Sequence, residues 1–322
     1  MGKGLEEYLF PESQEDLINI THPTGVTGER MSSPTEFKVS RLYASQAKDG
    51  ESSFWSLYLA ERKGLSKIIT ESDLSSFAIA IAKIYYSQDH TTRHKGLAEL
   101  KPILGDTEGI ILSTLNEISR ESYGEIEPTS DQKKKIKQLI TALHNNPITI
   151  KDRKGEPIEF FLITQIARKP SPKTGAITYL LKVNNLYLLE AIKNDYIKFP
   201  SDVMFRLTDS LRERKLKNRG RYIKLMRYLS QWTKTGVKKI NFDTILSTIE
   251  MTDYYRKDKK KGEKLLSSLY SVMKDIGLLR SDLSENPVYS AKDNMITFYL
   301  NKEWSKDKNI ELLPLQNPPE NE

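Results

Sequence analysis

KKINFDTILSTIEM, residues Lys238–Met251, and KGEKLLSSLYSVMKDIGLL, residues Lys261–Leu279, are the two stretches that decide the fold. The first begins with a short β-type segment, Lys238–Phe242, rich in residues that favour strands. Asp243 then provides a suitable N-cap, so a helix is predicted over Thr244–Glu250.

The second stretch belongs to a longer helix, which we predict over Lys259–Ile276 with Gly277 as its C-terminal stop. Apolar side chains recur at helical spacing along it, which indicates one buried face. These residues are Leu265, Leu266, Leu269, Val272, Met273 and Ile276.

The flanking segments complete a recognisable order of elements. A helix that ends near Trp232 comes first, with Tyr222 and Leu229 at the two ends of its apolar face. Two strands come last, Leu278–Asp282 and Met295–Leu300, joined by a turn-rich tip. Helix, strand, two helices and a β-hairpin make up a winged helix, which is a helix-turn-helix unit with a β "wing".

An earlier part of the chain has a similar order. Helical spacing is predicted from Asp73 through Ile84, over Gly109–Ser119, and from Thr129 to a stop at Asn145–Pro147. Strand-like segments follow at Ile148–Ile150, Ile158–Ile166 and Ala176–Val183, and further helical segments at Tyr187–Tyr196 and Ser201–Lys217. Phe54–Leu59 is predicted to pack on this unit as a short helix or strand.

The fold class expected is therefore α+β, mainly helical, with two winged-helix domains in tandem. The first is predicted over residues 73–199 and the second, which would read DNA, over residues 200–304. Residues 1–72 form an acidic N-terminal arm that is partly disordered, and residues 305–322 form a disordered tail.

Charge is distributed unevenly along this chain. Arg212–Arg280 holds 19 Lys and Arg against 7 Asp and Glu, a net of +12, whereas all 322 residues together carry only +7. A concentrated positive field favours a polyanionic partner, and double-stranded DNA is the partner predicted. Solvated helix faces are the alternative explanation.

The predicted long helix offers the best candidate contacts, because its outward side would enter a DNA groove. Lysines neutralise phosphates, and serine can bond to phosphates or base edges. The residues predicted to bind DNA here are Lys260, Lys261, Lys264, Ser267, Ser268 and Ser271, with Arg256 and Lys257 at the helix entry.

Two further groups are weaker candidates for DNA contact. In the first unit the corresponding outward residues are Lys133, Lys134, Lys137 and Gln138. Between the units, Arg219 and Arg221 are predicted to contact phosphates, although an acidic partner or a dimer surface would suit them equally.

Residue types argue against catalysis. The chain has no cysteine, which excludes disulfides, thiol nucleophiles and Cys-ligated metals. His90 and His94 have the spacing of metal ligands on a helix but lack an evident third ligand, so no metal is expected. A phosphate-binding GxxxxGK[ST] loop and a nucleophile–base set are also absent from the sequence, so we expect a non-enzyme without a cofactor.

The location predicted is the cytoplasm. Met1–Ile20 is acidic and lacks the apolar segment of a secretory signal. Because no stretch of about 18 apolar residues occurs, membrane is not expected among the partners.

Several passages of the chain resemble the replication initiators of theta-type plasmids, which bind repeated origin sequences called iterons through tandem winged helices. These passages are ITYLLKVNNLYLLEAI (Ile177–Ile192), RGRYIKLMRYLSQW (Arg219–Trp232) and the two stretches quoted at the outset. The resemblance spans about Asp73 to Trp304 but does not cover the acidic N-terminal region.

That resemblance implies binding to origin repeats, opening of nearby duplex and recruitment of host replication proteins, with a homodimer as a possible second form. Two alternatives remain open: a winged-helix transcription regulator, and a non-catalytic interaction scaffold, because a fold alone does not define a function.

Overall fold

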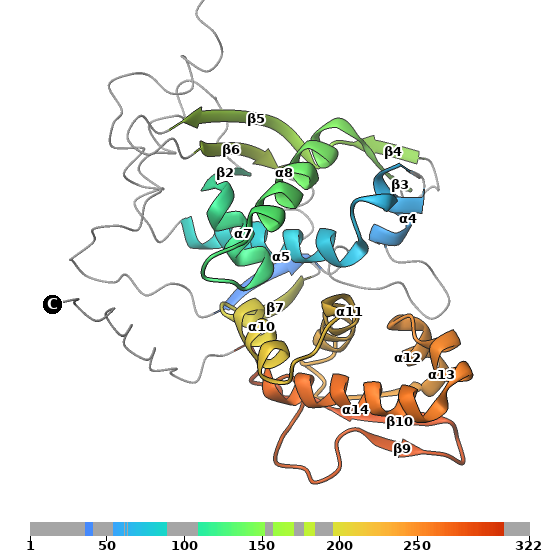
Figure 1. The fold of residues 1–322 in the computed structure, drawn as a ribbon. Coiled ribbons are helices and arrows are strands. Elements are labelled where there is room, and N and C mark those ends of the chain that lie inside the picture. Colours follow the sequence, from blue (N-terminus) through green and yellow to red (C-terminus); the bar gives the residue numbers. More distant parts are fainter. Residues whose placement is uncertain are drawn as a thin grey trace, which may run out of the picture.

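The computed structural model describes residues 36–40, 54–60, 62, 64–88, 109–151, 157–170, 177–183 and 196–305. Helices and strands alternate through these residues in the mixed manner expected of an α+β protein (Figure 1). They are arranged in two units, each with its own hydrophobic core.

The first unit surrounds one of these cores. Its helices are α4 (Phe54–Ala60), the 3-10 helix η1 (Leu65–Lys67), α5 (Glu71–Gln88), α7 (Leu115–Tyr123) and α8 (Ser130–Asn145). Its strands are β2 (Ile110–Thr114), β3 (Ile148–Lys151), β4 (Pro157–Phe160), β5 (Ile163–Pro170) and β6 (Ile177–Val183). Strands β2, β6 and β5 form one antiparallel sheet, and β3 and β4 form a separate pair.

The second unit combines the C-terminal elements with an early strand. Its helices are α10 (Val203–Glu213), α11 (Arg219–Ser230), α12 (Phe242–Thr248), α13 (Thr252–Lys257) and α14 (Lys259–Asp275). Its strands are β1 (Glu36–Ser40), β7 (Tyr196–Pro200), β8 (Val237–Asn241), β9 (Val288–Ser290) and β10 (Met295–Tyr299).

Both units share one topology. In the first, α5, β2, α7, α8, β5 and β6 occur in this order, with the pair β3 and β4 inserted between α8 and β5, and the sheet order is β2-β6-β5. In the second, α11, β8, α12, α14, β9 and β10 occur in the corresponding order, with α13 inserted between α12 and α14, and the sheet order is β8-β10-β9. In each sheet, the last strand of the unit therefore pairs with both of the others.

Helix α5 is buried between the two units and contributes to both cores (Figure 1). Phe77 and Ile81 pack into the first core, whereas Ile79 and Ala82 pack into the second. A helix that is apolar on all sides is stable in water only when neighbours cover each side, and here α7 and α11 lie against it. The two units are thus joined by a shared core element.

The C-terminal end of α7 adds polar contacts to this junction. The Thr208 hydroxyl of α10 donates to the Tyr123 carbonyl oxygen at 2.6 Å, and Arg212 pairs with Glu125 at 2.6 Å. Gly124, in the left-handed conformation with φ +61°, ends α7 directly against the backbone of Met204. The Thr208 hydroxyl thus satisfies a helix-end carbonyl of the other unit, and the ion pair adds a second polar contact between the units.

The prediction of one helix over Gly109–Ser119 is wrong in its first half. Residues Ile110–Thr114 form β2, and α7 begins only at Leu115, where the Thr114 side chain accepts a hydrogen bond from the Glu117 amide. All five side chains of β2 are buried. Burial on both faces produces a continuous apolar stretch, which hides the two-residue period of a strand.

The first predicted wing strand, Leu278–Asp282, is also wrong. Leu279 forms only an isolated bridge with Leu300, and β9 lies further along the chain. The Asn286 side chain connects this segment to β10. Its Nδ2 donates to the carbonyl oxygens of Arg280 and Tyr299, and its Oδ1 accepts from the backbone amide of Tyr299.

A smaller correction concerns the helix predicted over Thr244–Glu250. Helix α12 begins two residues earlier, and its N-cap is Asn241, whose side chain accepts a hydrogen bond from the Asp243 amide. Asp243 thus lies in the first turn of the helix, where a carboxylate is favourable for the helix dipole.

The expected arm over residues 1–72 contains parts of both cores. Strand β1 pairs with β7 and buries Phe37 and Val39 in the second core. Trp55 and Tyr58 of α4 are buried in the first core, as expected for Phe54–Leu59. Acidic composition did not reveal β1, because only two of its side chains are apolar.

Several predictions fall outside the described residues. They concern residues 1–35, the residues of the predicted helix Tyr187–Tyr196 before Tyr196, the tail after residue 305, and both His90 and His94. In the part of the chain that is described, no helix has the length and hydropathy needed to cross a bilayer.

Candidate nucleic-acid interface

Helix α14 has nearly the bounds that the sequence predicted for it. Asp258 caps it by accepting a hydrogen bond from the Lys261 amide at 3.0 Å. This backbone hydrogen bond, with the nearby Lys261 ammonium, holds the pKa of the Asp258 carboxyl below its ordinary value. The buried residues of α14 are Gly262, Leu266, Leu269, Val272 and Met273. Gly277, with φ +75°, follows the end of the helix.

Gly262 brings α13 close to α14. A Cβ atom at this position would lie 2.5 Å from Cδ2 of the Tyr255 ring, so only glycine permits the observed packing. Arg256 and Lys257 of α13 are exposed and follow Tyr255 directly. The close approach therefore holds two more cations beside the N-terminal end of α14.

The six α14 residues predicted to bind DNA all lie away from the core. Lys260, Lys261, Lys264 and Ser267 are exposed, and Ser268 and Ser271 are half-buried. The Ser268 hydroxyl donates to the Lys264 carbonyl oxygen at 3.0 Å, so its hydrogen is already engaged within the helix. The remaining outward side chains form a surface of cations and hydroxyls.

Most of the cations on this surface have no acidic partner. Lys261 pairs with Asp258 at 2.9 Å, and Lys259 lies 4.0 Å from Glu263. Within the described ranges, Arg256, Lys257, Lys260 and Lys264 form no ion pair. We call these four residues the free-cation cluster. An anion brought to this cluster would not have to displace an existing carboxylate.

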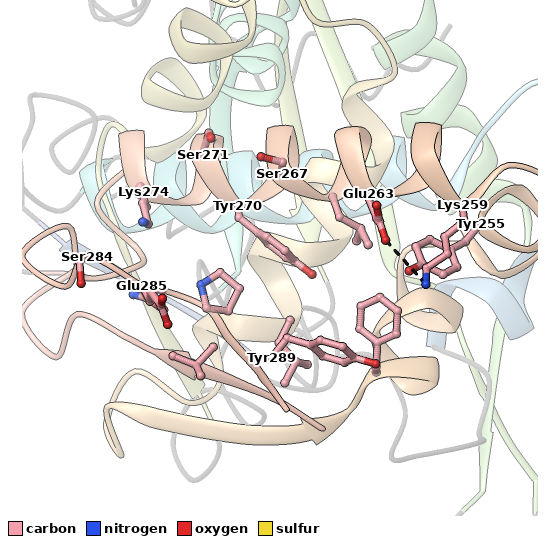
Figure 2. A pocket seen from close by; sticks show the side chains of 16 residues that line it. Tyr255, Lys259, Glu263, Ser267, Tyr270, Ser271, Lys274, Ser284, Glu285 and Tyr289 are labelled. Atoms are coloured by element: carbon pink, nitrogen blue, oxygen red, sulfur yellow. Dashed lines mark ion pairs between the residues drawn. The ribbon is translucent and has the colours of Figure 1, made fainter. Parts of the chain in front are cut away.

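A groove of about 490 Å³ runs along α14 on the side of the loop that precedes β9 (Figure 2). Lys259 and Lys274 lie near its two ends, and Ser267 and Ser271 of the helix are among the residues that line it. Sequence reasoning missed Lys259, Lys274 and Tyr289 as members of this surface. Lys274 shares a side of the helix with Ser267 and Ser271, so helical spacing could have included it.

Helix α8 holds the corresponding place in the first unit. A capping box at Thr129 and Gln132 starts it, and Ile136, Leu139 and Leu143 bury its inner face. The predicted residues lie outward: Lys134 and Lys137 are exposed, and Lys133 and Gln138 are half-buried. In the described part of the protein none of these three lysines forms an ion pair. The α8 surface is therefore a smaller version of the α14 surface.

Arg219 is partly buried at the contact between the units. Its guanidinium donates to the Ser122 carbonyl oxygen at 2.9 Å and lies 5.3 Å from the centre of the Tyr123 ring. Burial lowers the pKa of Arg219 to about 10. One donor of Arg219 thus faces the end of α7, and the phosphate contact predicted for this residue stays a prediction.

Arg221 is partly exposed on the other side of α11. It lies 5.7 Å from the centre of the Tyr254 ring and reaches the Glu250 carbonyl oxygen at 3.5 Å. These contacts place Arg221 beside α13, so it remains compatible with the phosphate contact predicted for it.

The chemistry of the surface is that of anion binding. Ammonium and guanidinium groups supply charge, and serine hydroxyls supply hydrogen bonds. Among the described residues, no group of three or more histidine, aspartate or glutamate side chains could hold a metal ion. Comparison with known proteins adds no relative, since neither the protein-family models nor the curated proteins include a match to this chain.

Proposed function

We propose that this protein is a plasmid replication initiator that binds repeated origin sequences in double-stranded DNA through two winged helices. The observation that carries the proposal is the free-cation cluster. Two of its residues, Lys260 and Lys264, lie on the outward side of α14, whose opposite side is committed to the core, and the other two lie on α13 beside the start of that helix. This division of a helix into a packed and a basic side is what a DNA-reading helix requires.

The topology supports the winged-helix part of the proposal. Apart from the inserted β3, β4 and α13, both units contain a helix, a strand, two helices and two strands in this order, with the first strand paired to the last. This order is the one expected of a winged helix and supports the proposal. In such a unit the second helix of the pair enters the major groove and the β-hairpin lies beside it. Helices α14 and α8 hold that place here.

The proposed mechanism requires no catalysis by this chain. The free-cation cluster binds DNA phosphates and thereby releases the counterions of the DNA. Two serines, Ser267 and Ser271, contact phosphates or the edges of bases in the DNA groove. Gln138 on α8 is able to recognise adenine. Copies bound to adjacent repeats would then destabilise nearby duplex in the cytoplasm and recruit host replication proteins. The resemblance to plasmid initiators is the source of this last step.

Selection of bound sequences from a random DNA library, together with parental-replicon DNA, tests the function. Directly repeated sites are the expected result for an initiator. Palindromic sites bound by a stable dimer would instead indicate a transcription regulator. If no specific site is found at about 150 mM salt, DNA reading itself is excluded and an interaction scaffold becomes the better description.

Replacing both Lys260 and Lys264 with alanine should weaken DNA binding about 30-fold at 0.15 M salt and lower the salt slope by about two. Each lysine is expected to neutralise one phosphate, because neither has a carboxylate to satisfy first. Fluorescence anisotropy over a range of salt concentrations measures both quantities.

The matched control replaces Lys67 and Lys302, which are also exposed but lie on other elements. It removes the same charge from the protein and should leave the salt slope unchanged. Equal losses in the two double variants would mean that only net charge matters and that α14 is not the interface.

A further inference from the structure

A second group of lysines surrounds a small pocket beside the β1–β7 sheet. The pocket has a volume of about 190 Å³. Three separate parts of the chain each contribute one lysine to its lining: Lys198 comes from β7, Lys234 from the turn after α11, and Lys302 from the segment after β10. None of the described residues that line the pocket is acidic. We call this site the lysine pocket.

The register of the sheet brings a fourth lysine to the site. Lys38 of β1 lies directly opposite Lys198 in the antiparallel ladder. Side chains at such positions lie close together on one face, so two like charges there destabilise a sheet. One carboxylate, that of Glu36, pairs with Lys198 and neutralises one of the four lysines. The fold thus keeps an unfavourable pair of cations here, and a bound anion would offset their repulsion.

The Tyr196 ring, which lines the pocket, positions two of these cations. The Lys38 ammonium lies 4.4 Å from the centroid of the ring, and the Lys234 ammonium lies 4.9 Å from it. Cation–π contacts of this kind orient an ammonium group without neutralising its charge. The positive charge is therefore placed at the pocket before any ligand binds.

Two of the lining lysines have no acidic partner. Lys234 and Lys302 are exposed and form no ion pair within the part of the chain that the structure describes. The hydroxyls of Ser230 and Thr233, which also line the pocket, donate to the backbone carbonyl oxygens of Arg227 and Ser230. The ammonium groups therefore dominate what the pocket offers to a ligand.

Convergent ammonium groups favour a compact anion with more than one charge. A terminal phosphate carries about −1.5 to −2 near pH 7 and has three acceptor oxygens, whereas a carboxylate carries a single charge. Lysine binds phosphate as a point charge. The pocket is smaller than the cavities of roughly 300–1,000 Å³ that enclose drug-sized ligands, so it suits a small group. Phosphate has both the charge and the size that the pocket requires.

The lysine pocket lies at the opposite end of α14 from the free-cation cluster. Trp304 fixes the segment that carries Lys302, because its indole nitrogen donates to the Ile276 carbonyl oxygen at 3.0 Å. Ile276 directly follows α14, whereas the cluster lies around the first two turns of that helix. The 17 residues of α14 span about 25 Å. A small ligand is therefore able to bind in the pocket without touching the DNA interface proposed above.

We infer that the lysine pocket binds a phosphate group of a small free compound, with Lys234 and Lys302 as its main contacts. Lys38 and Lys198 add positive charge beside them. The inference does not depend on the proposed function, because the pocket shares no residue with the free-cation cluster. The DNA backbone is a second source of phosphate, although each of its phosphodiesters carries only one charge, and the experiment separates the two sources.

Titration calorimetry of the full-length protein with pyrophosphate tests the site at about 0.15 M salt. We expect a single saturable site. Replacing both Lys234 and Lys302 with alanine should weaken pyrophosphate binding about 100-fold, because two charge-assisted hydrogen bonds are lost.

The matched control replaces Lys239 and Lys292 with alanine. These lysines are exposed and belong to the same unit, but they do not line the pocket. The control removes the same charge and should change the affinity for pyrophosphate less than about 2-fold. Thermal unfolding of both double variants should match that of the unchanged protein, since exposed side chains contribute little to stability.

Two results of the titration would overturn the inference. One is the absence of saturable binding up to about 10 mM pyrophosphate, because three converging lysines should bind more tightly than that. The other is an equal loss of affinity in the two double variants, which would mean that net charge alone attracts the anion.

Duplex DNA binding identifies the source of the phosphate. The Lys234→Ala, Lys302→Ala variant should keep the salt slope of the unchanged protein. A slope lowered by about two would assign the pocket to the DNA backbone and reject a small free ligand. If pyrophosphate binds as expected but the unchanged protein binds no DNA, the lysine pocket stands and the proposed function fails.

Discussion

Replacing Glu71 with glutamine is expected to lower the free energy of unfolding by about 3 kcal/mol, because it leaves buried cations without their counter-charge. Glu71, in the first turn of α5, lies 3.0 Å from the Lys224 ammonium and 3.3 Å from the Arg227 guanidinium of α11. The Arg227 side chain is 0% exposed. Burial lowers the pKa of Arg227, and the Glu71 carboxylate opposes that shift.

The control uses the second carboxylate on the same lysine. Glu250 lies 2.5 Å from Lys224, but its side chain is 70% exposed. Glu250→Gln is therefore expected to cost less than about 1 kcal/mol, since water screens the pair. Urea unfolding at neutral pH measures both variants. Equal effects would show that burial at the junction of the two units is not what makes Glu71 important.

Gly124→Ala should destabilise the protein by about 2–5 kcal/mol, from two independent causes. The left-handed backbone at φ +61° costs any residue with a Cβ about 1–2 kcal/mol. The added Cβ would also overlap the carbonyl group of Met204, which is backbone and cannot rotate away. Overpacking of this kind costs about 1–3 kcal/mol. Thermal or urea unfolding gives the difference.

Gly64→Ala is the matched control for this change. Gly64 has φ −71° and no heavy atom within 4 Å of the position of a Cβ, so alanine should be neutral or stabilise by up to about 1 kcal/mol. A Gly124 variant that unfolds like the Gly64 variant would mean that α7 and α10 separate readily, against the close contact described above.

The sequence predicted the helices that have one apolar side. Helix α14 begins at the predicted residue and ends one residue before Ile276, because its apolar side chains recur without interruption. Helix α8 is equally regular, and both lie with their predicted cations outward. Elements buried on two sides were less predictable. Strand β2 shows no alternation of buried and exposed residues, because all five are buried. Strand β1 pairs with β7, which is far away in the sequence, so no local pattern could predict this pairing.

The sequence predicted the residues of the candidate site that lie on α14, but not the groove beside this helix. Spacing alone identified Lys260 and Lys264, since it gives the direction of each side chain on a helix. Spacing could not predict that Arg219 packs against Tyr123. The sequence around an arginine near the start of a helix is the same whether its side chain faces solvent or another part of the protein. The groove depends on the loop before β9, and its course follows from Asn286 and its three hydrogen bonds.

The pairing of β1 with β7 sets the timing of folding during synthesis. Glu36 and Lys198, which form an ion pair across these strands, are 162 residues apart. At about 5–20 residues per second, a ribosome needs roughly 8–30 s to make that length. Phe37 and Val39 stay without their final neighbours for this interval. The second core is therefore completed only after the first unit has been synthesised, because β1 cannot pair until β7 has been made.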